Sequence, residues 1–378
     1  MRVALPNSTG RLEPFTLKTE PLRLRVPKVK WNRVAFAAAH VVADPFSDGG
    51  IDWKATLACR AHLLKLGFNI AEAMDTSQRG MGLNWPGAHA LIARSLKSAG
   101  SEAARVYSGC GTDHLDPGVT HSLDDVTRAY LEQMSAIQKL GGRIILMASR
   151  ALVRAAKTPD DYLKVYARVL AEADQPVILH WLGEMFDASL KGYWGNDGFV
   201  LAMETCLATI NANEAKIDGI KISLLDAEKE IAMRRALPAS VKMYTGDDFN
   251  YAELIAGDAQ SYSHALLGIF DAIAPAASQA LTALASGKAE TFHTLLAPTV
   301  ALSRLIFQAP TQHYKTGIVF LAWLNGYQDH FVMLAGAQSL RSLAYFVECF
   351  KLAEKAALLC KPDLAVRRMK QLLAMYGV

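Results

Sequence analysis

The sequence feature that most constrains the fold is a unit that recurs eight times. Each unit holds a short apolar run, a polar loop and then a helix with recognisable first and last residues. Units of roughly 30 residues that alternate strand and helix are typical of parallel strands joined by crossover helices. The apolar runs, of which the last is the most weakly marked, cover residues 33–43, 68–74, 104–107, 143–147, 176–181, 217–225, 240–244 and 259–264.

Capping residues mark the helices between these runs. The first helix begins near Asp52 and ends at Gly67, which gives it an acidic start and a glycine stop. Ser122 is the predicted cap of another helix, and Thr158 followed by Pro159 opens a third. These three helices each come after one of the apolar runs, as a strand–helix repeat requires.

Eight strand–helix units close into a barrel more naturally than they extend into an open sheet. We therefore predict an α/β fold, a (β/α)8 TIM barrel with a C-terminal helical extension. A doubly wound sheet is the alternative, but the first run leads into HVVADPFSDGG and not into a glycine-rich phosphate loop. The predicted parts are an N-terminal extension (1–32), the barrel (33–274) and a helical extension packed on it (275–378).

Charge and composition exclude several classes of partner. The chain has 40 basic and 36 acidic residues, a net charge of +4, and no basic block, so nucleic acid and anionic membranes are not expected partners. Its most apolar late stretch, 317–324, is far shorter than the ~20 residues that span a bilayer, and residues 1–15 do not resemble a secretory signal. Five scattered cysteines predict a reduced, cytoplasmic chain.

Lys221 is the sharpest candidate, because the active site of a TIM barrel lies at the C-terminal ends of its strands. It stands between Ile220 and Ile222 in a predicted strand, where an ammonium group is costly unless it is paired or neutral. A neutral amine is the nucleophile that forms a Schiff base with a carbonyl. The alternative is a structural lysine that pairs with Asp218 or Asp226, and the pattern alone leaves both interpretations open.

His180 is the second candidate, at the end of the 176–181 run. An imidazole there acts as a general acid–base catalyst or only closes the core as a buried polar residue. A different interpretation groups four strand-end residues around a divalent metal ion, although no short-range ligand motif supports it: His40, Asp75, His114 and His180.

Two further features have two interpretations each. The segment 187–199 (DASLKGYWGNDGF) is either a lid over the barrel mouth or a packing loop on the surface. Cys110, between two glycines, is either a nucleophile or, in the absence of an obvious partner base, an inert thiol.

Two strand motifs resemble those of the dihydrodipicolinate synthase / N-acetylneuraminate lyase superfamily. They are PVILHWLG at 176–183 and, about forty residues later, IDGIKISLLD at 217–226; YTGDD at 244–248 resembles a third element of that family. The resemblance runs over roughly 33–274. It implies a (β/α)8 barrel with C-terminal helices, assembly into homodimers or homotetramers, and Schiff-base chemistry on a 2-oxo acid.

The resemblance also assigns roles to residues. Lys221 corresponds to the Schiff-base lysine, and Thr76 and Ser77 to a Thr-Thr pair that binds the substrate carboxylate. The sequence departs from the family where His180 replaces a tyrosine, and where Asp75 replaces a glycine. The full predicted substrate-binding set is Asp75, Thr76, Ser77, Gly111, His114, Gly246 and Asp247, with Lys221 and His180 as catalytic residues.

Three functional hypotheses follow. The first is a class I lyase, an aldolase or dehydratase that acts on a small 2-oxo acid or an oxidised sugar acid in carbohydrate metabolism; it needs no cofactor and no metal, because the lysine supplies the electron sink. The second is a divalent-metal-dependent barrel enzyme on a sugar or sugar acid. The third is a non-catalytic protein that binds sugar acids.

Overall fold

The computed structural model describes residues 1–74 and 78–378, which form two compact units. The barrel unit comprises Arg33–Ala38 and Asn69–Leu267, and the helical unit comprises Met1–Asn32, Ala39–Phe68 and Gly268–Val378. Residues 39–68 therefore group with the last third of the chain. The predicted three-part division at 33 and 275 stays a prediction.

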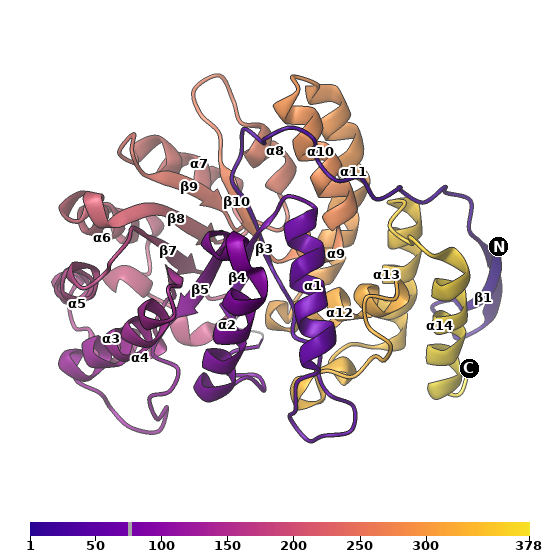
Figure 1. The fold of residues 1–378 in the computed structure, drawn as a ribbon, viewed down its shortest axis with the longest axis horizontal. Helices are drawn as coiled ribbons and strands as arrows, with labels where there is room; N and C mark the ends of the chain where they lie inside the picture. Colours follow the sequence, from indigo (N-terminus) through magenta and orange to yellow (C-terminus); the bar gives the residue numbers. More distant parts are fainter. Residues whose placement is uncertain (75–77) are drawn as a thin grey trace. The chain divides into compact units, whose positions relative to one another are not determined.

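The barrel unit contains a closed barrel of eight parallel strands, which confirms the predicted TIM barrel and excludes the open doubly wound sheet. The strands follow the order β10-β3-β4-β5-β6-β7-β8-β9, so neighbours in sequence are neighbours in space (Figure 1). Their bounds are β3 Ala35–Ala38, β4 Asn69–Glu72, β5 Val106–Cys110, β6 Arg143–Leu146, β7 Val177–Leu182, β8 Ile217–Ser223, β9 Lys242–Thr245 and β10 His264–Leu267.

The predicted eighth strand, 259–264, is wrong in position. It overlaps β10 only at His264, because Asp258 folds the residues before the strand into a turn. The Asp258 carboxylate accepts hydrogen bonds from the backbone N–H groups of Gln260 (2.9 Å) and Ser261 (2.9 Å). Because the Asp258 side chain binds these backbone N–H groups, they do not pair with a neighbouring strand, and β10 begins only at His264.

The barrel interior is filled by apolar and aromatic side chains. Phe36 contacts two other rings of this interior edge-on, with its ring centroid 4.8 Å from that of Tyr107 and 5.7 Å from that of Tyr244. The cluster comprises Phe36, Ala38, Ala71, Met74, Tyr107, Ile145, Met147, Ile178, Tyr244 and Leu266. The interior is therefore a packed core, and it identifies which face of each strand points inward.

Helices cover the outside of the barrel sheet (Figure 1). The predicted caps are confirmed: Ser122 and Thr158 each form a capping box with the aspartate three residues on, Asp125 and Asp161. The helices of this unit are α2 Trp85–Ala99, α3 Leu123–Lys139, α4 Arg150–Ala155, α5 Pro159–Ala171, α6 Phe199–Ala212, α7 Ala227–Ala236 and α8 Tyr251–Ala256.

The helical unit is helical beyond residue 275, as predicted. Its helices are α1 Trp53–Lys65, α9 Ile269–Ala272, α10 Ala274–Ala285, α11 Ala289–Ile306, α12 Tyr314–Leu324, α13 Leu343–Lys355 and α14 Pro362–Met375. Sequence analysis missed one feature, an antiparallel hairpin of β1 (Arg2–Pro6) and β2 (Leu12–Thr16).

Residues near the start of the chain contact α13 within the helical unit. The Phe15 and Phe350 ring centroids are 6.2 Å apart. The backbone N–H groups of Lys18 and Thr19 donate to Glu354 Oε1 at 2.6 and 2.7 Å. Segments more than three hundred residues apart in sequence thus build one hydrophobic and hydrogen-bonded contact.

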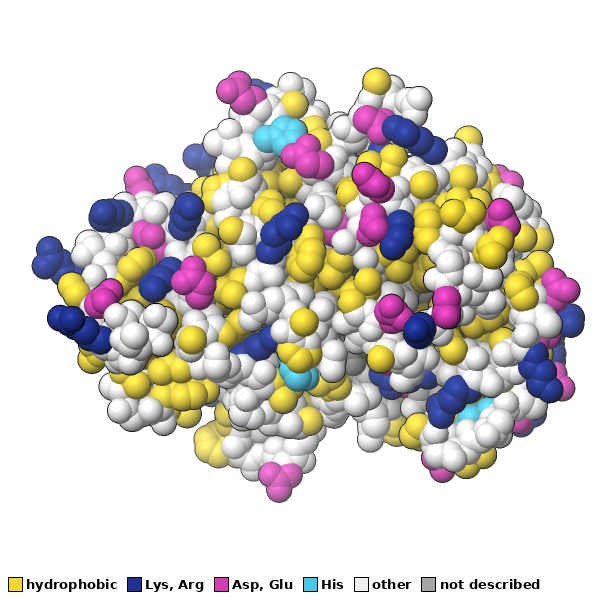
Figure 2. Space-filling view, turned by 180° about the vertical axis from the view of Figure 1, so that it is seen from behind, with side chains coloured by type: hydrophobic (Ala, Val, Ile, Leu, Met, Phe, Trp, Pro, Cys, Tyr) yellow, Lys and Arg dark blue, Asp and Glu magenta, His cyan; other side chains and the backbone are white. Residues whose placement is uncertain are grey.

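One face of the molecule carries charged side chains of both signs (Figure 2). On the face shown in Figure 2, basic and acidic side chains are interspersed and form no block of one sign. Within the described part of the chain, no helix combines the length and apolar character needed to cross a membrane.

Candidate functional site

Two ionisable side chains enter the barrel interior from neighbouring strands. His180 of β7 and Lys221 of β8 are register partners, and Lys221 is also the register partner of Tyr244 on β9. Partners on adjacent strands point to the same face of a sheet. Because Tyr244 belongs to the interior cluster, Lys221 and His180 point into the interior too.

Lys221 is buried, with only 6% of its surface exposed. Of the two carboxylates expected as its structural partners, Asp218 binds Lys242 Nζ (2.5 Å) and accepts a hydrogen bond from the Tyr244 hydroxyl (2.6 Å). The other, Asp226, caps α7 and contacts the Lys229 ammonium. These contacts of the two carboxylates are therefore with residues other than Lys221.

His180 is buried beside Lys221, and its Nε2 lies 3.2 Å from the Ser223 hydroxyl oxygen. Burial, together with the positive charge of Lys221, holds the pKa of His180 well below its usual range. The imidazole is therefore neutral near pH 7 and able to take up a proton. Ser223 shares the inward face because it lies two residues beyond Lys221 on β8.

Gly246 provides the space that these side chains occupy. A Cβ atom at this position would lie 2.2 Å from Ser223 Oγ and 2.7 Å from Lys221 Cε. It would also lie 2.6 Å from the carbonyl oxygen of Ile222, so two side chains and a backbone atom would all have to move. The predicted residues that the structure brings together are thus Lys221, His180 and Gly246.

Asp247 follows Gly246, but its carboxylate serves the loop between β9 and α8. One oxygen accepts from the backbone N–H groups of Phe249 (2.8 Å) and Asn250 (3.0 Å), and the other from Asn250 Nδ2 (2.8 Å). These contacts shape the loop beside Gly246. A role of Asp247 in substrate binding stays a prediction.

Gln133 on α3 connects two other predicted residues. Its Oε1 accepts from the Gly111 backbone N–H (2.8 Å), and its Nε2 donates to His114 Nδ1 (2.8 Å). The other ring nitrogen of His114 lies 3.4 Å from Glu132, also on α3. His114 is therefore engaged by α3, whereas His180 contacts Ser223 of β8.

The remaining predicted substrate-binding residues, Asp75, Thr76 and Ser77, lie outside the described residues. Among the described residues, three side chains with metal-ligand atoms come together in one place, and these are His40, Cys59 and Asp271. That group contains neither His114 nor His180. The geometry of the described residues thus gives no support to the metal site predicted from His40, Asp75, His114 and His180.

A cavity of about 230 Å³ that sequence analysis missed adjoins the C-terminal end of β6. Met147, a member of the interior cluster, lines it together with Arg79, Arg150 and Arg154. Arg79 is buried and ion-paired with Asp113. Arg150 and Arg154 are four residues apart on α4, so their side chains lie on the same face of the helix and close to each other. We call this the arginine cavity.

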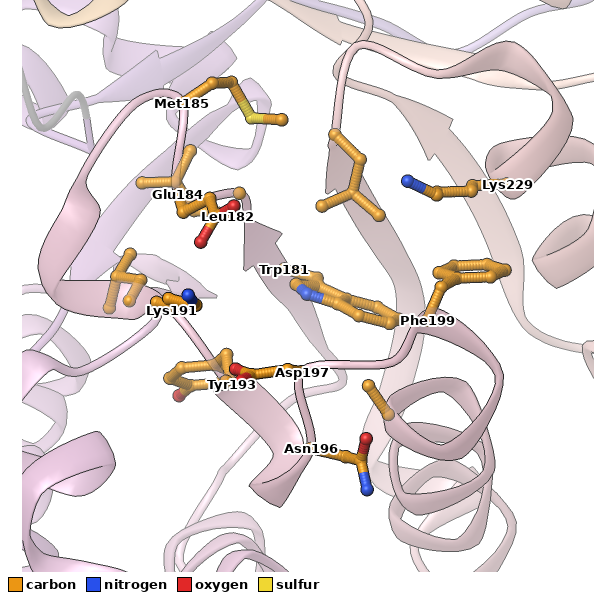
Figure 3. Close-up of a pocket in the computed structure, with 15 residues that line it drawn as sticks. Trp181, Leu182, Glu184, Met185, Lys191, Tyr193, Asn196, Asp197, Phe199 and Lys229 are labelled. Carbon is orange, nitrogen blue, oxygen red and sulfur yellow. The ribbon is translucent and has the colours of Figure 1, made fainter.

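The segment 187–199 packs into the protein through its aromatic residues. Trp194 is fully buried and stacks on Tyr166 of α5, with ring centroids 4.9 Å apart. The segment also walls a pocket of about 180 Å³, in which Trp181 and Phe199 stack side by side and the Lys229 ammonium lies over the Phe199 ring (Figure 3). Its anchoring favours the packing interpretation over the mobile lid.

Cys110 ends β5, fully buried. Burial raises the pKa of its thiol to about 12, and the thiol donates to the carbonyl oxygen of Tyr130 (3.4 Å). A thiol with such a pKa is not a nucleophile at neutral pH, which agrees with the inert interpretation.

Several solved structures share this fold. Dihydrodipicolinate synthase from Aquifex aeolicus matches with a TM-score of 0.65 and 13% identity, over 87% of this chain and 99% of that chain. The prophage protein YagE from E. coli K12, of the dihydrodipicolinic acid synthase family and in complex with pyruvate, has a TM-score of 0.68 and 13% identity over 86% and 99%. The chloride-inhibited dihydrodipicolinate synthase from Acinetobacter baumannii, complexed with pyruvate, has a TM-score of 0.62 and 17% identity over 86% and 99%.

The resemblance stated from the two strand motifs is thus confirmed at the level of the fold. The model of the family described as "Protein of unknown function (DUF993)" matches residues 3–378. No curated protein matches the sequence.

Proposed function

This chain belongs to the DUF993 family, and on its barrel we propose a class I lyase in which Lys221 forms a Schiff base with a small 2-oxo acid or oxidised sugar acid. The observation that carries the proposal is the register pairing of Lys221 with His180 inside the barrel, beside Ser223 and a glycine that leaves room for them. A buried lysine next to a neutral imidazole pairs a nucleophile with a base.

The chemistry uses only side chains of this chain. Once deprotonated, the amine of Lys221 attacks the C2 carbonyl carbon, and the resulting carbinolamine takes up a proton and loses water to give an iminium ion. In an aldol cleavage the C3–C4 bond then breaks and its electron pair forms the enamine. The C4 hydroxyl gives its proton to His180, directly or through Ser223, and C4 leaves as the carbonyl carbon of the second product. Reprotonation and hydrolysis then release the product and restore the free amine.

For the substrate we propose a 2-oxo acid, with pyruvate as the first candidate. Two of the solved structures with this fold, YagE and the Acinetobacter baumannii enzyme, are complexes with pyruvate. Thr76 and Ser77 are proposed to hold the carboxylate at C1. A second acidic group, as in an oxidised sugar acid, would find positive charge in the arginine cavity.

The test is borohydride reduction in the presence of pyruvate and several longer 2-oxo acids, followed by peptide mass spectrometry. We expect a covalent adduct on the peptide that contains Lys221. Lys229, on the pocket of Figure 3, is the internal control and should stay unmodified. If folded protein gives no adduct with any of these acids, the Schiff-base proposal is wrong, and metal content with a chelator assay decides between the two other hypotheses.

Replacing His180 by glutamine tests the proposed base. We expect kcat/KM to fall by about 10²–10⁴-fold, the usual contribution of a general acid–base group. The wild-type base is active when deprotonated, so its activity is lost only as the pH falls through a pKa that lies well below 6.5. The variant should lack this acidic limb. An unchanged pH profile in a folded His180→Gln variant contradicts the assignment.

We further propose that the enzyme works in the cytoplasm as a homodimer or homotetramer. The five cysteines are all free, as suits a reducing compartment. The assembly follows the family resemblance, and small molecules are the partners that the interspersed surface charge favours.

A further inference from the structure

The helical unit contains a cavity of about 210 Å³ that the proposed lyase chemistry does not use. Its walls come from α1, from Asp271 of α9, from the start of α10, from the end of α12 with the residues after it, and from His40. Ala58 on the solvent-exposed side of α1 also lines it, so the cavity has an outer rim.

Two hydrogen bonds to Asp271 fix the orientation of the His40 ring. One oxygen of the carboxylate accepts from His40 Nδ1 at 2.8 Å and from the His40 backbone N–H at 2.8 Å. The other oxygen faces the Cys59 thiol at 3.8 Å. With Nδ1 engaged, the ring presents Nε2, which is buried and has no hydrogen-bond partner although His40 is only 1% exposed.

A second polar atom on this cavity, Nε2 of His62, one turn beyond Cys59 on α1, is buried without a hydrogen-bond partner. The buried hydroxyl of Tyr327 also lines the cavity and has the Cys360 thiol as its neighbour. The His62 and Tyr327 rings pack with their centroids 4.7 Å apart. A buried polar group without a partner is unfavourable, so His40 Nε2 and His62 Nε2 on one cavity, beside the Tyr327 hydroxyl, indicate positions for the atoms of a ligand.

The charge around the cavity favours an anion. Asp271 is shared by His40 and by Lys315, whose Nζ lies 3.8 Å away in a side chain that is 1% exposed. Burial by itself would lower the pKa of His40, but Asp271 and Cys59 outweigh it and raise the pKa to about 10. His40 Nε2 therefore carries a proton and is a donor that lacks an acceptor.

A metal ion is a weaker match for the same residues. The ligand atoms of His40, Cys59 and Asp271 lie within 4.8 Å of one another. However, coordination would require His40 to lose the proton it shares with Asp271, and the Lys315 ammonium would repel a cation.

We propose that this cavity is a binding site for a small anion, a carboxylate or phosphate group that accepts hydrogen bonds from His40 Nε2 and the Tyr327 hydroxyl, with His62 as the third contact. The cavity volume limits the ligand to a few heavy atoms. The site shares no residue with the Lys221 site, and it stands whether or not the Schiff-base proposal holds.

The test is isothermal titration calorimetry on the full-length Lys221→Met variant, which removes pyruvate capture at Lys221. Inorganic phosphate, acetate and pyruvate are titrated separately, and the response distinguishes a phosphate site from a carboxylate site. We expect one-to-one binding of at least one of them. Ala58→Phe, which fills the rim, should raise Kd at least tenfold, whereas Ala61→Phe, on an exposed position of α1 outside the cavity lining, should not.

His62→Leu provides a second test, because it leaves the His40–Asp271 pair intact and removes one polar contact. It should also weaken binding about tenfold. The proposal is overturned if none of the three anions binds, or if binding is the same in Ala58→Phe and His62→Leu as in the parent. It is overturned as well if the protein instead binds zinc stoichiometrically in a manner that Cys59→Ala abolishes.

Discussion

Replacing Lys221 by methionine is expected to abolish turnover, with kcat/KM falling on the order of 10⁴-fold or more. Methionine keeps the length and apolar stem of lysine and removes only the amine that attacks the carbonyl. The borohydride adduct should disappear with the activity. Steady-state kinetics on the 2-oxo acid that gives the adduct, together with circular dichroism to establish folding, make the measurement.

Activity separates a catalytic from a structural lysine in this variant. Methionine has a similar shape and volume, so Lys221→Met should stay folded while turnover is lost. Lys229→Met is the matched control, and it should keep full activity because Lys229 lies in the pocket of Figure 3. A Lys221→Met variant that is folded, less stable and still active would show a purely structural lysine.

Replacing Gly246 by alanine is expected to reduce kcat/KM by at least about 10²-fold, since misplacing reacting groups by roughly 1 Å has effects of this size. The added Cβ would overlap Ser223 Oγ and press on Lys221 Cε. It should also lower the free energy of unfolding by about 1–3 kcal/mol, as overpacking does in a close-packed interior. Urea denaturation and steady-state kinetics measure the two effects.

A second substitution tests the cause. Ser223→Ala in the Gly246→Ala background removes the nearer clash and should restore part of the stability, although the contact with the Ile222 carbonyl remains. Gly118→Ala is the control, because its Cβ would meet only an Asp116 carboxylate oxygen at 3.2 Å. Full activity in Gly246→Ala would mean that the Lys221 amine does not need the position seen here.

The barrel could be predicted because its signals are local. Caps such as Ser122 and Thr158 act within one helical turn, so the sequence around each of them is sufficient. The β1–β2 hairpin was missed, although Val3 and Leu5 alternate with exposed residues and Asn7 forms the turn through its side chain. Two prolines, Pro6 and Pro14, obscure that alternation.

The candidate site could be predicted only in part. The side chain of Lys221, between two isoleucines, had to point either into the barrel or toward the helices. The sequence of this one strand does not show which of the two directions it takes. The register of β8 with β7 decides it, and that register shifts at a bulge between Val177 and Ile178. The engagement of His114 depends on Gln133, nineteen residues away on α3, and no short-range pattern reports such a contact.

The contact of residues 15–19 with α13 has a consequence for biosynthesis. The ribosome makes the first strand pair long before its partners Phe350 and Glu354 exist. Nearly the whole polypeptide must emerge before the helical unit can close, whereas most of the barrel strands emerge earlier and adjacent to their neighbours. Residues 15–19 therefore lack these packing and hydrogen-bond partners until α13 has been synthesised.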